Sequence, residues 1–134
     1  MTEARVFSIV LAASAIGLMG CSGFDRLDFT YKSAPPDGAN VSFNAIRIHD
    51  GIAVGVVARP MDGNDTMDED TLVELESRNP GVLGVGQGVA DDPEDTDVAN
   101  WNFVFYGVGV GSTDIIVRVN GETEAQIPAT VDAQ

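Results

Sequence analysis

The sequence predicts an all-β fold, a sandwich of about 100 residues with seven or eight strands. Short segments in which apolar and polar residues alternate recur along the chain, and a period of two is typical of a half-buried strand. Turn-forming Gly, Pro, Asn and Asp residues separate these segments. After the first 20 residues, no segment has the 3.6-residue period of an amphipathic helix. The 134 residues allow one domain besides its tails.

The strands can be assigned in order along the chain. Residues 26–32 alternate strictly, with Leu27, Phe29 and Tyr31 on one face. Further strands are expected at 41–48, 52–58, 72–77, 82–89, 101–108, 114–119 and 122–131. Polar loops are expected at 60–70 and 90–100, and His49-Asp50-Gly51 is expected to form a turn. Asn120-Gly121 is a strong hairpin signal, which requires positive φ at both residues.

The glycine-rich segment 107–113, GVGVGST, has the composition of a phosphate-binding loop. Such a loop connects a strand to a helix, because the helix N-terminus directs its amides at the phosphate. Here the β-prone run DIIVRV follows, and no Lys precedes Ser112. The glycines therefore predict a tight corner between strands, and no nucleotide is expected as a partner.

A family resemblance is carried by two stretches, LESRNPGVLGV and FYGVGVGSTDIIVRVNGETEAQIPATV. Together they resemble a bacterial Ig-like domain of group 2 over about residues 45–131. The matching positions are Ser77, Asn79, Pro80, Val82, Gly111, Ile115, Val117, Gly121 and Val131. Leu75 stands where the family usually has Trp, and residues 90–100 lengthen one loop. The resemblance implies an Ig-like sandwich with surface-exposed or adhesion-associated roles.

The charge is strongly acidic, with 21 Asp and Glu against seven Lys and Arg, a net charge of −14. Such a chain repels phosphate backbones, which argues against nucleic acid as a partner. The 44% of apolar residues is enough for a packed core.

The N-terminus has the features of a signal peptide over residues 1–20. Arg5 precedes an apolar run from Val6 to Met19, which is too short to span a bilayer comfortably. The run ends in Leu18-Met19-Gly20-Cys21, which resembles the lipobox, the processing motif of bacterial lipoproteins. The resemblance implies that Cys21 becomes the first residue and carries a diacylglycerol and an N-acyl chain. Ser22 after the cysteine points to the outer membrane.

The expected organisation is a signal peptide over 1–20, a lipidated Cys21 with a tether over 21–38, and an Ig-like domain over 39–134. The tether includes the additional strand at 26–32. We expect a non-catalytic lipoprotein whose partners are the lipid bilayer and an envelope or extracellular protein or glycan.

Catalysis is disfavoured by the residue types available. His49 is the single histidine and Cys21 the single cysteine, so neither a nucleophilic triad nor a zinc site can be assembled in the usual way. The His49 ring is expected to cap or flank a turn. No cofactor is expected.

The alternative function is a calcium-dependent recognition or adhesion module. Two acidic loops, 62–70 and 91–97, carry carboxylates that could converge at one end of a sandwich. The candidate ligands are Asp62, Asp65, Asp68, Asp70, Asp92 and Asp95. Both loops can equally be solvated and mutually repelling.

Overall fold

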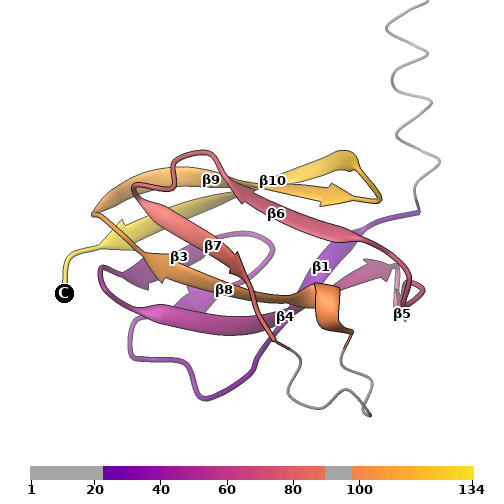
Figure 1. Ribbon diagram of the computed structural model, residues 1–134, viewed down its shortest axis with the longest axis horizontal. Coiled ribbons are helices and arrows are strands. Elements are labelled where there is room, and N and C mark those ends of the chain that lie inside the picture. The colour runs from indigo at the N-terminus through magenta and orange to yellow at the C-terminus, as the bar shows by residue number, and fades with distance from the viewer. Residues whose placement is uncertain (1–22, 90–97) are drawn as a thin grey trace, which may run out of the picture.

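The computed structural model describes residues 23–89 and 98–134, and these form an all-β sandwich of two sheets (Figure 1). The elements are β1 (Arg26–Tyr31), β2 (Asn40–Val41), β3 (Ile46–His49), β4 (Ala53–Asp62), β5 (Asp65–Thr66), β6 (Val73–Ser77), β7 (Leu83–Gln87), the 3₁₀ helix η1 (Ala99–Trp101), β8 (Asn102–Gly107), β9 (Gly111–Val119) and β10 (Glu122–Asp132). The predicted fold class is confirmed.

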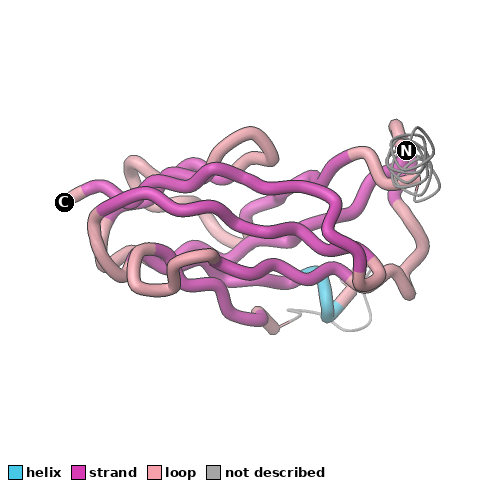
Figure 2. Tube along the Cα trace, turned by 90° about the horizontal axis from the view of Figure 1, so that it is seen from above, coloured by secondary structure: helices cyan, strands magenta, loops and turns pink. Residues whose placement is uncertain are grey.

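Within residues 23–89 and 98–134, each sheet contains five strands. Sheet A has the order β1-β4-β8-β7, with β5 paired to β4, and sheet B has the order β2-β3-β10-β9-β6. The pairs are antiparallel except for β3 and β10, which are parallel from Ile46↔Ala129 to His49↔Asp132. The strands run along the length of the molecule and leave the loops at its two ends (Figure 2).

The core lies between the sheets and is built from the inward positions of the alternating strands. Its largest fully buried side chains include Phe105 of β8, Leu27 of β1, and Ile115 and Ile127 of the β9–β10 hairpin. Each such side chain contributes about 1.5–3 kcal/mol on burial. Leu27 lies within the segment 21–38 assigned above to the tether, and β1 pairs with β4 from Arg26↔Met61 to Tyr31↔Val56. The sandwich therefore includes this segment from Arg26 onward.

The strand expected at 41–48 is instead two short strands with a turn between them. Ser42 N–H donates to the Ala45 carbonyl at 3.0 Å, and Ala45 N–H donates to Ser42 Oγ at 3.2 Å. Serine offers the backbone such local partners in place of a ladder, which divides the strand. β2 then pairs antiparallel with β3.

The prediction of a loop over residues 60–70 is also partly wrong. β4 continues through Pro60 and Met61 to Asp62, and β5 pairs back onto it with Asp62 opposite Asp65. Met61 is buried, and its place in the core extends the strand beyond the last residue of the apolar run. Gly63, with φ of 61°, forms the turn between the two strands.

Two turn predictions are confirmed. Asn120 and Gly121 have φ of 52° and 84°, as a two-residue hairpin between β9 and β10 requires. Residues 107–111 form a corner that leads from β8 into β9, and no helix follows it. A Cβ on Gly107 would lie 2.5 Å from the His49 carbonyl oxygen, so this corner needs glycine for a close backbone approach.

Candidate functional site

The loops at the two ends of the sandwich hold most of the residues that sequence reasoning singled out. We call the end with the β4–β5 turn and the Asn120-Gly121 turn the hairpin end. The end with the 107–111 corner and the last residues of the chain is the corner end (Figure 1).

Cys21 lies outside the described residues, and the first residues that the structure describes, from Gly23 onward, lie at the hairpin end. Asp25 N–H donates to the Met61 carbonyl at 2.8 Å, and the rings of Phe24 and Phe43 pack edge to face with centroids 6.1 Å apart. A Cβ on Gly23 would lie 3.3 Å from Asp62 Oδ2. The chain therefore joins the sandwich beside the β4–β5 turn.

Arg26 fastens this junction. Its Nη1 donates to the Gly63 carbonyl at 2.8 Å, and its guanidinium forms ion pairs with Asp28 at 2.9 Å and Asp25 at 3.0 Å. The hydrogen bond with Asp28 raises the pKa of Arg26 above its ordinary value. The guanidinium thus holds β1 to the turn after β4.

The first acidic loop does not gather its carboxylates. Asp62 and Asp65 face each other across the β4–β5 pair, while Asp68 and Asp70 follow in the connection to β6, and all four are exposed. Among residues 23–89 and 98–134, no group of three or more His, Cys, Asp or Glu side chains is placed to hold a metal ion. The other two candidate ligands, Asp92 and Asp95, lie outside the described residues. A calcium site therefore stays a prediction.

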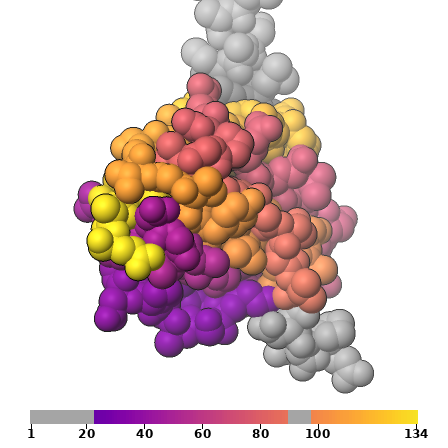
Figure 3. All heavy atoms as spheres, turned by 60° about the vertical axis from the view of Figure 1, so that its left-hand side comes forward, coloured from indigo at the N-terminus to yellow at the C-terminus, as the bar shows by residue number. Residues whose placement is uncertain are grey.

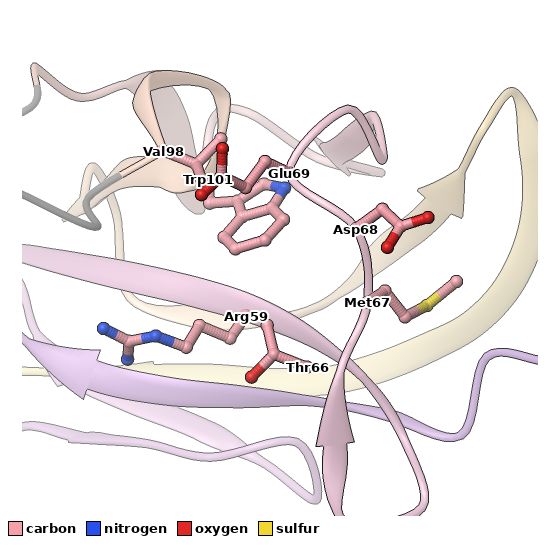
Figure 4. A pocket seen from close by; sticks show the side chains of 7 residues that line it. All are labelled: Arg59, Thr66, Met67, Asp68, Glu69, Val98 and Trp101. Carbon is pink, nitrogen blue, oxygen red and sulfur yellow. The ribbon is translucent and has the colours of Figure 1, made fainter.

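A depression of about 420 Å³ adjoins this loop at the hairpin end (Figure 4). Its lining residues are Arg59, Thr66, Met67, Asp68, Glu69, Val98 and Trp101. Trp101 is only 2% exposed, and its indole N–H donates to the Thr71 carbonyl at 2.9 Å. The ring is therefore packed as part of the hydrophobic core. Asp68 and Glu69 are exposed to solvent at the rim of this depression.

His49 ends β3 at the corner end and flanks the turn to β4, as predicted. Ile52 N–H donates to the His49 carbonyl at 3.2 Å, and ring Nδ1 lies 3.1 Å from the Ala133 carbonyl oxygen. A Cβ on Gly38 would lie 2.2 Å from ring Nε2, so the loop before β2 packs directly on the imidazole. Figure 3 shows the last residues of the chain, in yellow, against the purple segment near residue 50. The ring is a packing element of this end.

A groove of about 330 Å³ lies along one side of the sandwich, between β6 and β7. Its lining residues are Leu72, Val73, Glu74, Leu75, Val85, Gly86, Gln87 and Phe103. Sequence reasoning missed this groove. Alternation identifies the faces of β6 and β7 but not that both strands end their sheets, which depends on pairings distant in the sequence.

Within the described residues, no helix is both long and apolar enough to cross a membrane. No protein-family model matches the chain, and no curated protein matches it. Among solved structures, the chain is similar to one described as "Crystal structure of the S-layer protein SbsC domains 4 and 5", with 15% identity and a TM-score of 0.44. The match covers 82% of this chain and 54% of that chain, so this chain spans about half the length of that structure.

The class that the residues themselves define is a two-sheet β-sandwich with a parallel β3–β10 pair. The group-2 Ig-like family stays a prediction from the sequence motifs, and the structural likeness is too low to argue function from it.

Proposed function

We propose that the chain is a non-catalytic lipoprotein of the bacterial cell envelope, which holds a β-sandwich at a membrane surface through acylated Cys21. The sequence supports an anchor by its apolar run and by Leu18, Gly20 and Cys21. The observation that carries the proposal is the short distance along the chain from Cys21 to the fold. Asp25 already hydrogen-bonds to β4, so only Ser22, Gly23 and Phe24 lie between.

This spacing sets where the sandwich would sit. Four residues from Cys21 to Asp25 reach at most about 14 Å when fully extended. Acylation of Cys21 would therefore hold the hairpin end next to the lipid and direct the corner end away from it. The sides of the sandwich, including the groove between β6 and β7, would stay accessible to a partner.

The number of acyl chains expected on Cys21 is enough for stable attachment to a membrane. One acyl chain gives marginal, reversible binding, whereas two or more give stable anchoring. The acidic hairpin end, with Asp62 and Asp65 exposed, is repelled by anionic headgroups. Attachment must then come from the acyl chains rather than from the protein surface. Ser22 favours the outer membrane as the destination.

The test is Cys21→Ser, with Ser22→Ala as the matched control, in cells fed an alkyne analogue of palmitate. We expect the parent chain and Ser22→Ala to carry the label and to fractionate with membranes. Cys21→Ser should carry no label, and should be either released from membranes or left at its unprocessed mass. A processed Cys21→Ser chain that stays with the membrane fraction would contradict the proposal.

A further inference from the structure

The two long sides of the sandwich differ in how they are closed. On one side, the edge strands β1 and β2 are joined across the sheets. Val41 N–H donates to the Tyr31 hydroxyl at 2.9 Å, and Phe24 packs on Phe43. On the other side, β6 ends sheet B and β7 ends sheet A within the part of the chain that the structure describes (Figure 1). The groove described above lies between these two strands.

The backbone N–H and C=O groups of β6 point alternately toward β9 and toward the opposite edge of the strand. Arg78 N–H donates to the Asp114 carbonyl at 2.9 Å, and Asn120 N–H donates to the Leu72 carbonyl at 2.8 Å. In an antiparallel pair, hydrogen-bonded and non-hydrogen-bonded positions alternate. The backbone N–H and C=O groups of the even-numbered residues of β6 therefore point toward β9. The N–H and C=O groups of Val73, Leu75 and Ser77 point away from it, which is the arrangement that accepts an additional strand.

The groove would receive half of the side chains of such a strand. An added strand alternates its side chains between the two faces of sheet B. Those on the inner face would enter the groove against Leu75 and Val85, which are half-buried, and above Phe103, which is buried. These surfaces are apolar, so apolar side chains gain free energy there.

The outer face of β6 carries an excess of negative charge. Glu74 and Glu76 are exposed there, and Arg118 of β9 forms an ion pair with Glu76 at 3.1 Å. One guanidinium thus faces two carboxylates in a chain of net charge −14. A second copy of the chain, paired edge to edge through β6, would place like charges opposite each other, which is destabilising. Charge complementarity therefore favours a basic segment over a second copy.

We propose that β6 is a docking edge for an extended segment of a partner protein in which apolar and basic residues alternate, and which adds to sheet B as a further strand. Main-chain hydrogen bonds to Val73, Leu75 and Ser77 supply the binding, and the alternating side chains supply the specificity. The docking edge lies in the folded sandwich and does not require acylation of Cys21. Its failure and the failure of the anchoring proposal are therefore separate outcomes.

The probe is an eight-residue peptide of alternating Val and Lys, with blocked ends, titrated into the ¹⁵N-labelled full chain. We expect the amide resonances of residues 73–77 to shift, and the amides of Val73, Leu75 and Ser77 to gain protection from hydrogen exchange. The matched peptide of alternating Val and Glu should leave these resonances unchanged. Shifts confined to other strands, or equal shifts with both peptides, would overturn the proposal.

A charge-reversed pair of variants separates docking from general attraction between a basic peptide and an acidic chain. Glu74→Lys should weaken binding of the Val-Lys peptide about tenfold, because it replaces an attractive cross-strand pair by a repulsive one. Glu122→Lys makes the same change in net charge on β10, at the exposed start of that strand, and should retain the affinity. An equal loss in both variants would overturn the proposal. The proposal would also be overturned if the parent chain associates with itself in the absence of peptide and Glu74→Lys changes that association.

Discussion

Substituting Gly121 tests the hairpin that joins β9 to β10 through its backbone alone. Gly121 has φ of 84°, and nothing lies within 4 Å of the position that a Cβ would occupy. The Cβ of Gly121→Val therefore meets no residue beyond its chain neighbours, and the expected cost comes from forcing a β-branched residue into the left-handed region. Backbone strain of this kind costs about 1–3 kcal/mol. For a domain of about 100 residues, the melting temperature should fall by roughly 4–8 °C per kcal/mol.

The assay is urea unfolding of the purified chain followed by tryptophan fluorescence, with thermal unfolding as a second measure. Trp101 is buried and reports the transition. Gly121→Asn is the matched control, because asparagine tolerates positive φ and should recover most of the lost stability. If Gly121→Val unfolds at the same urea concentration as the parent, or if Asn and Val cost the same, the argument from backbone strain is refuted.

Three further outcomes follow from the structure. Gly107→Ala should lower the free energy of unfolding by about 1–3 kcal/mol, because its Cβ would lie 2.5 Å from the His49 carbonyl oxygen, and urea unfolding measures it. Gly86→Ala, whose Cβ would meet only Tyr106 at 4.0 Å, should raise stability by about 0.5–1 kcal/mol, and an equal loss in both glycine variants would contradict this reasoning. For the acidic loops, we expect calcium and sodium to raise the melting temperature alike at equal ionic strength, by screening repulsion. A calcium-specific gain, such as about 2.7 kcal/mol at a hundredfold excess over the dissociation constant, that is lost in Asp68→Asn/Asp70→Asn would instead establish the calcium-dependent alternative.

The sequence predicts those parts of the fold whose cause is local. Alternation locates β1 and β6 to within a residue or two, and Asn120-Gly121 places its hairpin because two positive φ values suit few other residues. The division of 41–48 was missed because it depends on the Ser42 side chain competing with the ladder. The extension of β4 through Pro60 was missed because it depends on core space for Met61, which only the packed sheets define.

The candidate sites also differ in whether their cause is local in the sequence. The position of Cys21 after an apolar run is a local pattern, and the sequence alone indicates it. The groove at β6 and β7 requires knowing that β6 pairs only with β9 and β7 only with β8 within the described residues. Those partners are more than 15 residues away in the chain, and no local pattern specifies them.

The central claim is that acylated Cys21 holds the sandwich at a membrane. Its most direct test is the intact mass of the N-terminal peptide, released by protease from the protein isolated from cell membranes. The account predicts a peptide that begins at Cys21 and carries the added mass of a diacylglyceryl group and an N-acyl chain. A peptide that begins at another residue, or an unmodified Cys21 within a longer N-terminal segment, would contradict it.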